Sequence, residues 1–82
     1  MSKKESSQDQ LEIVRNNIRN LRISRGWNIT QLAEKTGIPL EDLIAIEDGA
    51  DCRLDYLRAI SDVFHVRMSQ MFRPLKEFHT ER

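Results

Sequence analysis

The chain of 82 residues contains a single cysteine, so it can form neither an internal disulfide nor a cysteine-based zinc site. This scarcity indicates a reducing compartment, and we interpret Cys52 as a small, half-buried filler rather than a reactive thiol. No apolar run approaches the roughly 20 residues that a membrane-spanning helix needs. The polar segment from Met1 to Gln10 also lacks the apolar stretch of a signal peptide. We therefore expect a cytoplasmic protein with no membrane partner.

Neither sign of charge is in excess, because 13 basic residues balance 13 acidic ones. No global field would therefore draw the protein toward DNA or toward a membrane surface. The charges are nevertheless distributed unevenly along the chain. Basic side chains dominate residues 10–35, and acidic ones dominate residues 37–62: Arg15, Arg19, Arg22, Arg25 and Lys35 in the first segment, and Glu41, Asp42, Glu47, Asp48, Asp51, Asp55 and Asp62 in the second.

Catalytic motifs are also missing from the sequence. His65 and His79 lie 14 residues apart and have no metal-ligand spacing to a cysteine or to another histidine. There is no glycine-rich phosphate loop and no nucleophile motif. We therefore expect a protein that is not an enzyme and that holds no metal and no cofactor.

The apolar spacing predicts one all-helical domain over residues 9–74, with a disordered N-terminal tail at residues 1–8 and a C-terminal tail at residues 75–82. The first helix carries one apolar stripe at intervals of three and four residues, and Gly26 ends it in a left-handed conformation. The members of this stripe are Leu11, Val14, Ile18 and Leu21.

Helix-terminating signals divide the rest of the domain. Asn28 and Gln31 have the spacing of a capping box that starts a short second helix, and Gly37 ends it. Ile38-Pro39 opens a third helix that Gly49 ends, with Leu43 and Ile46 facing inward. A fourth helix and a last helical turn, which Pro74 blocks, complete a compact five-helix bundle; their apolar positions are Leu54, Leu57, Ile60, Val63, Phe64, Met68, Met71 and Phe72.

Three short patterns together resemble the XRE family of helix-turn-helix proteins, the lambda-repressor and Cro type. They are Leu32-Ala33-Glu34-Lys35 followed by Gly37, Ile46-Glu47-x-Gly49, and the segment from Val66 to Phe72. The resemblance covers about Arg15 to Phe72 and implies a lambda-repressor-like DNA-binding domain whose second and third helices form the helix-turn-helix. It implies a small bacterial or phage transcriptional regulator, typically a repressor, that occupies a double-stranded DNA operator. Such proteins usually bind as dimers, and Leu75 to Phe78 would be a candidate for self-association.

The resemblance also implies one structural contact and a set of DNA-contacting positions. Arg22 and Glu47 would form a largely buried ion pair that fixes the first helix against the third. The DNA-contacting positions lie on the recognition helix and its flanks: Asn28, Thr30, Gln31, Leu40, Glu41, Asp42, Ala45 and Arg53.

The recognition helix departs from the family pattern because it is acidic and apolar. None of its outward side chains can donate a hydrogen bond to a base, although Glu41 or Asp42 could accept one from a cytosine amino group, and Asp48 would oppose a nearby phosphate. The alternative hypothesis is a protein-interaction module with little or no DNA binding, which would use Ile29, Leu40 and Ile44 as an exposed apolar patch. This patch exists only if Leu40 and Ile44 do not join the core.

Two further interpretations concern the remaining basic and aromatic residues. Arg15, Arg19 and Arg22 share one flank of the first helix, which is either a solvated face or a second route to nucleic acid. Trp27 is expected to pack in the fold rather than to serve as a stacking platform.

Overall fold

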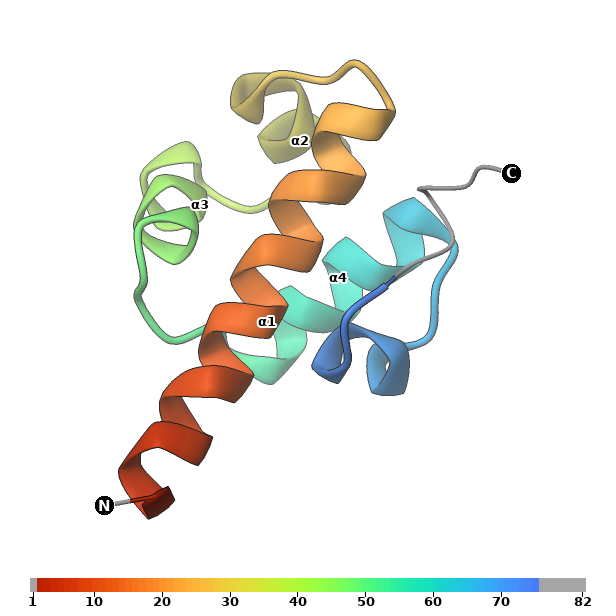
Figure 1. Ribbon diagram of the computed structural model, residues 1–82. Coiled ribbons are helices and arrows are strands. Elements are labelled where there is room, and N and C mark those ends of the chain that lie inside the picture. The colour runs from red at the N-terminus through yellow and green to blue at the C-terminus, as the bar shows by residue number, and fades with distance from the viewer. Residues whose placement is uncertain (1, 76–82) are drawn as a thin grey trace.

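The computed structural model describes the backbone of residues 2–75 and the side chains of residues 10–75. Its elements in chain order are α1 (Ser2–Ser24), α2 (Ile29–Thr36), α3 (Leu40–Glu47), α4 (Leu54–Phe64) and a 3-10 helix, η1 (Met68–Phe72) (Figure 1). Because residues 2–75 contain no strand, the prediction of an all-helical fold is confirmed. No helix in this part of the chain is both long and apolar enough to cross a membrane.

The fifth element, expected as a last helical turn of a five-helix bundle, is a 3-10 helix of only five residues and not an α-helix. Proline has no backbone N–H and its ring clashes with the preceding turn of a helix, so Pro74 prevents η1 from continuing. Residues 2–75 therefore contain four α-helices and one short 3-10 segment.

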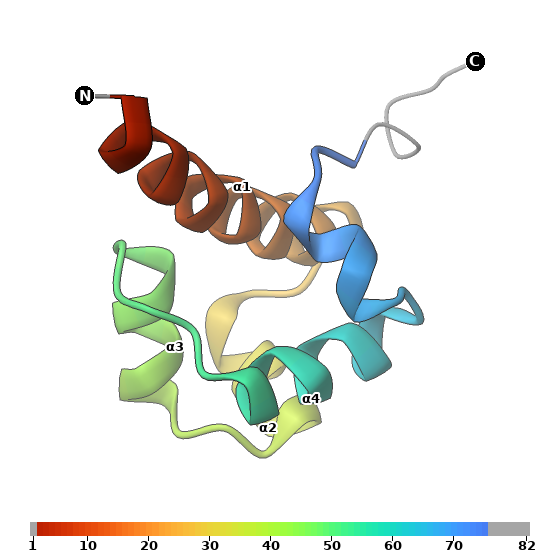
Figure 2. The ribbon, with the colours of Figure 1, turned by 90° about the horizontal axis from the view of Figure 1, so that it is seen from below.

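The long helix α1 lies across the other elements, and its N-terminal turns extend beyond them (Figures 1 and 2). It contacts α3 and η1, while α2 contacts α3 and α4, and α4 contacts η1. The start of α1 at Ser2 differs from the disordered tail expected for residues 1–8. Residues 2–8 contain no glycine or proline, and extending a helix that packing has already nucleated costs little free energy.

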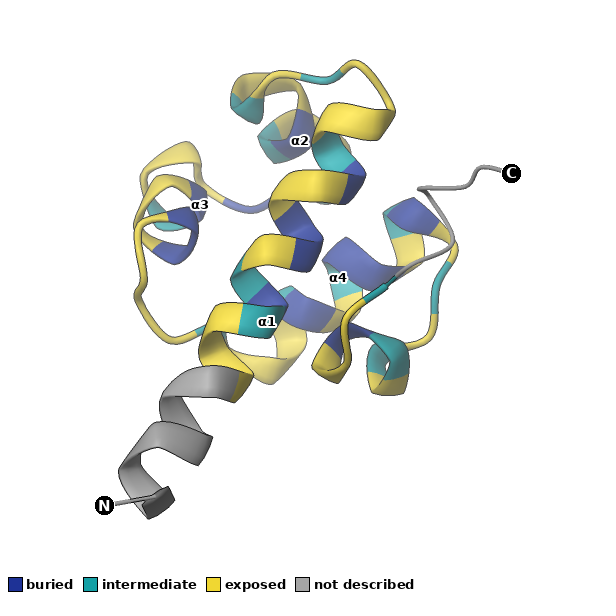
Figure 3. Cartoon of the chain, in the orientation of Figure 1, coloured by how far each residue is buried: buried dark blue, intermediate teal, exposed yellow. Residues whose placement is uncertain are grey.

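The core gathers the predicted apolar positions of every helix, as the buried segments in Figure 3 show. Three predicted members of the apolar pattern lie outside it: Leu11 is 40% exposed, Leu54 is 66% exposed and Phe72 is 40% exposed. Leu54 is the first residue of α4, and Leu11 lies one turn before the buried part of α1. The buried apolar residues are Val14, Ile18, Leu21, Leu32, Ile38, Leu43, Ile46, Leu57, Ile60, Phe64 and Met71.

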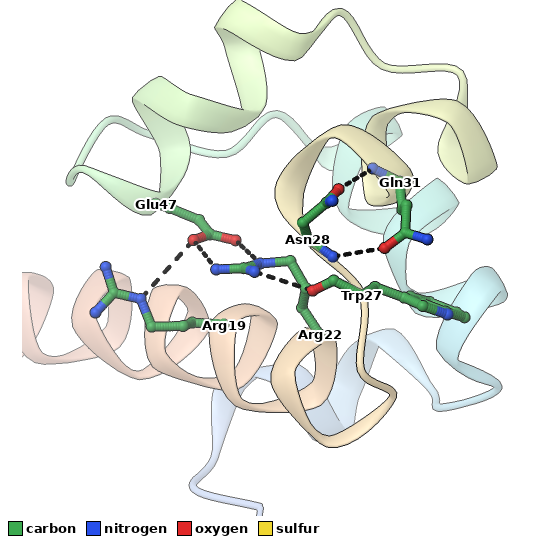
Figure 4. Close-up of polar contacts among 6 residues, drawn as sticks. All are labelled: Arg19, Arg22, Trp27, Asn28, Gln31 and Glu47. Carbon is green, nitrogen blue, oxygen red and sulfur yellow. Dashed lines mark hydrogen bonds and ion pairs between the residues drawn. The ribbon is translucent and has the colours of Figure 1, made fainter.

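The predicted helix ends are confirmed at α2. The Asn28 side chain accepts a hydrogen bond from the backbone N–H of Gln31 at 2.8 Å, and the Gln31 side chain accepts one from the backbone N–H of Asn28 at 2.8 Å (Figure 4). Gly37 then ends α2 in the left-handed region with φ of 79°. Pro39 is the N-cap of α3 rather than its first residue, and its carbonyl accepts from the backbone N–H of Leu43 at 3.2 Å.

Asn17 holds the end of the described chain against α1. Its buried side-chain amide donates to the carbonyl oxygens of Met71 at 2.9 Å and Arg73 at 2.8 Å, and its Oδ1 accepts from the N–H of Leu75 at 3.3 Å. Leu75 also packs against the core, although the sequence placed it in the predicted C-terminal tail. The rest of the predicted C-terminal tail, residues 76–82, lies outside the described residues.

Candidate functional site

The candidate site consists of α2, α3 and the three residues that join them. Gly37 turns the chain out of α2, and the buried Ile38 anchors the connection in the core. The Thr36 hydroxyl accepts from the N–H of Ile38 at 3.2 Å, while it donates to the Leu32 carbonyl at 2.8 Å. This short, internally bonded connection fixes how α3 lies relative to α2.

An ion pair locks α3 to α1, which confirms the predicted contact between Arg22 and Glu47 (Figure 4). The guanidinium donates through Nε at 2.8 Å and through a terminal nitrogen at 2.9 Å to the two carboxylate oxygens, a bidentate arrangement. Its other terminal nitrogen donates to the Trp27 carbonyl at 3.1 Å. Only 16% of the Arg22 side chain and 7% of the Glu47 side chain are exposed. The hydrogen bonds to Glu47 raise the pKa of Arg22, although burial acts in the opposite direction.

The arginine flank of α1 is largely engaged within the chain. Arg22 is buried in the ion pair, and Arg19 lies 3.8 Å from the same Glu47 carboxylate. Arg15 lies 3.7 Å from Glu12. The second route to nucleic acid along this flank therefore reduces to Arg19, which is about half exposed.

The outward face of α3 carries two large apolar side chains. Leu40 is 38% exposed and Ile44 is 49% exposed, so the alternative in which they join the core is wrong. Glu41 and Ala45 are also exposed on this face, whereas Leu43 is fully buried on the opposite one. Ile29, the third residue of the predicted patch, is half-buried and packs against the core. We call Leu40, Glu41, Ile44 and Ala45 the α3 face.

Asp42, one of the predicted DNA contacts, points toward α4. Its carboxylate accepts a hydrogen bond from the Tyr56 hydroxyl at 2.7 Å. This hydrogen bond raises the pKa of Tyr56, and burial of the hydroxyl acts in the same direction. The role of Tyr56 could not be predicted from the sequence, because nothing in the spacing of two residues 14 apart on different helices signals their contact.

The other predicted polar contacts are also partly engaged. Arg53 donates two hydrogen bonds to Asp55, at 3.1 and 2.9 Å, and its guanidinium lies over the Tyr56 ring. The side-chain oxygens of Asn28 and Gln31 accept the capping bonds at the start of α2. Of the eight predicted DNA contacts, the exposed positions without such bonds among the described side chains are Thr30, Leu40, Glu41 and Ala45.

Trp27 packs in the fold, as the sequence indicated. It is half-buried against the core, and its ring stacks on Phe64 with 5.4 Å between the centroids. Lys35 and Arg25 lie over its ring, with Lys35 Nζ 4.7 Å from the centroid. These contacts occupy the ring, so it offers no free platform for a nucleotide base.

Cys52 is half-buried, and burial raises the pKa of its thiol to about 11, with the nearby Asp55 carboxylate acting in the same direction. A thiol with this pKa is almost entirely protonated at neutral pH and reacts slowly. Among the residues that the structure describes, no three His, Cys, Asp or Glu side chains come together in a group that could hold a metal ion.

No protein-family model, curated protein or solved structure gives a significant match to this chain. Any proposal about its function therefore rests on its own residues.

Proposed function

We propose that this chain is a small DNA-binding transcriptional regulator in which α2 and α3 form a helix-turn-helix of the XRE type. The observation that carries the proposal is the way α3 is held. The bidentate contact between Arg22 and Glu47 fixes its inner side, while the α3 face stays exposed. A recognition helix needs this combination of a rigid mount and a free outer surface.

The dimensions of α3 suit the major groove of DNA. An α-helix such as α3 is about 10–12 Å across with its side chains, and the groove is about 12 Å wide. In this arrangement the α3 face would meet the base edges. Thr30, exposed in the first turn of α2, would lie toward a phosphate, where hydroxyl groups and helix N-termini commonly make contacts.

Arg53, the one cation among the predicted DNA contacts, is paired within the chain, which gives the proposal a measurable signature. Arg22 and Arg53 are paired with carboxylates within the chain, and Asp48 lies exposed just after α3. If about two phosphates are neutralised per domain, the affinity should fall by about tenfold between 50 and 200 mM salt. A typical DNA-binding protein with six to ten phosphate contacts would lose about 10³–10⁵-fold over the same range.

The testing experiment is selection of fragments from sheared genomic DNA by tagged protein at both salt concentrations. Enrichment of one sequence motif that Ile44→Ala weakens and Ile23→Ala leaves unchanged would support the proposal. Ile23 is the matched control because it is an exposed isoleucine on α1, away from the α3 face. Retention of DNA without any motif, or no retention at either salt concentration, would contradict it.

A second candidate function, a protein-interaction module, is favoured by one observation. The α3 face places Leu40 and Ile44 beside Glu41, and Asp48 follows, a surface of apolar and acidic character that is common in protein-binding sites. In this case DNA selection fails, and the tagged protein retains a specific partner that Ile44→Ala releases while Ile23→Ala does not. The two functions are thus separated by whether Ile44→Ala weakens a selected DNA motif or releases a protein partner.

A further inference from the structure

We propose that α3 recognises pyrimidines in its operator, with Leu40 and Ile44 contacting thymine methyl groups and Glu41 accepting a hydrogen bond from the amino group of a cytosine. This inference rests on the proposed DNA-binding function and specifies which bases that function would select. It concerns the α3 face alone.

The side chains of the α3 face cannot donate a hydrogen bond to a base. Its side chains are leucine, glutamate, isoleucine and alanine, none of which offers a hydrogen-bond donor when the carboxylate is ionised. In the major groove guanine presents only acceptors, at N7 and O6, so it cannot pair with a carboxylate. Adenine offers the N6 amino group but places the N7 acceptor beside it, which would repel a second carboxylate oxygen. Cytosine presents the N4 amino group as a donor, so it matches Glu41 best.

Glu41 is also the acidic group of α3 that is available for such a contact. It is exposed in the first turn of the helix, and none of the hydrogen bonds or ion pairs among the described side chains involves its carboxylate. Asp42 accepts from Tyr56, and Glu47 is buried with Arg22, so neither competes for the base.

The apolar side chains lie at a spacing that fits neighbouring base steps. Leu40 and Ile44 are four residues apart, which corresponds to a rise of about 6 Å along the helix axis. Successive bases of one strand are about 3.4 Å apart, so the two side chains span about two base steps when α3 follows the groove. Each is more than one third exposed in the free protein, so a thymine methyl group could cover apolar surface that water now contacts.

The test uses the DNA sequence obtained by selection, synthesised with deoxyuridine in place of thymidine at single positions. Removing one contacted methyl group should weaken binding by about fourfold, as expected for the loss of one buried carbon. Ile44→Ala should abolish the sensitivity to uracil at one position and Leu40→Ala at another, about two steps away. Ile23→Ala should change neither.

Glu41→Gln provides a separate test, because a side-chain amide pairs with adenine N6 and N7 while a carboxylate does not. The variant should change the preferred base at one position from cytosine to adenine and leave the other positions unchanged. Asp62→Asn is the matched control, since Asp62 is exposed on α4 away from the α3 face, and it should not alter the motif. Thermal melting of every variant establishes that the fold is retained.

Three outcomes would overturn the inference. Binding that is insensitive to uracil at every position would contradict pyrimidine recognition while leaving the proposed function intact. A uniform gain in affinity for all sequences by Glu41→Gln would mean that the carboxylate only repels phosphates. Failure to select any motif would remove the proposed function and the inference with it.

Discussion

The ion pair between Arg22 and Glu47 provides the strongest stability prediction for this fold. Replacing Arg22 by alanine removes three hydrogen bonds, of 2.8, 2.9 and 3.1 Å, and leaves a carboxylate that is only 7% exposed without its cation. Breaking a buried pair in this way costs about 3–5 kcal/mol. A domain of this size is stable by only about 5–15 kcal/mol, so Arg22→Ala should lose a large part of its free energy of unfolding.

The assay is thermal and urea unfolding followed by circular dichroism and by the fluorescence of Trp27, the single tryptophan. A loss of 3 kcal/mol corresponds to a decrease in Tm of at least about 12 °C in a domain of this length. Arg19→Ala is the matched control because Arg19 lies 3.8 Å from the same carboxylate but is about half exposed. An exposed pair contributes about 0–1 kcal/mol, so this control should lower Tm by a few degrees at most.

A double variant separates the loss of the pair from the cost of the orphaned carboxylate. Arg22→Met combined with Glu47→Met leaves no buried charge, and replacing a buried pair with apolar residues is often neutral or stabilising. The double variant should therefore be more stable than Arg22→Met alone. The reasoning is refuted if Arg22→Ala melts within about 2 °C of the wild type, or if the two single substitutions are simply additive.

The remaining predictions concern single contacts. Asn28→Ala removes the capping bond to α2 and should cost about 1 kcal/mol, measured by urea unfolding; an unchanged midpoint would show that the cap contributes nothing. His65→Gly should stabilise the protein by about 0.5–1 kcal/mol, since His65 ends α4 with φ of 60°, where a side chain is strained. Alkylation of Cys52 at pH 8 should be about 100-fold slower in the folded than in the urea-unfolded protein, because its pKa rises from about 9 to about 11; equal rates would contradict the burial. The absorbance of Tyr56 at about 295 nm should titrate above its ordinary pKa of about 10 and return toward that value in Asp42→Asn. Folding raises the pKa of both Cys52 and Tyr56, so the folded state favours their protonated forms. The contribution of each group to stability is therefore complete below its unfolded pKa and is lost as the pH rises through its folded pKa.

Local signals in the sequence predicted the helix ends and the core well. A capping box, a glycine and a proline act within a few residues of the chain, so Asn28, Gln31 and Gly37 could be assigned their roles directly. The apolar period likewise identified Val14, Ile18 and Leu21 as the buried stripe of α1. The long-range pair of Arg22 with Glu47 was predicted only through the family resemblance, since no local rule connects residues 25 apart.

The partners of polar side chains could not be predicted in this way. Asn17 donates to carbonyl oxygens 54 and 56 residues away, and Asp42 accepts from Tyr56 across two helices. Such contacts depend on where backbone and hydroxyl groups come to lie after packing, and the apolar period contains no information about that. For this reason the candidate site differs from the predicted one mainly at Asp42 and Arg53, which have partners within the chain.

The internal pairing of charges also explains how this domain would have to bind DNA. Arg22 and Arg53 are each bonded to a carboxylate, while Glu41 and Asp48 are exposed on and beside α3. The surface around α3 is therefore acidic, although the chain as a whole has no net charge. An acidic surface does not attract DNA electrostatically, so association with DNA should lack the roughly 10–10³-fold acceleration that a basic cleft gives. Specificity would then depend on short-range contacts of Leu40 and Ile44, which form only on a matching sequence. A single domain that neutralises few phosphates binds weakly, so binding as a dimer to two half-sites about one helical turn apart would double both kinds of contact. A chain that remains monomeric in light scattering at micromolar concentration, with and without the selected DNA, would therefore favour the protein-interaction module over the regulator.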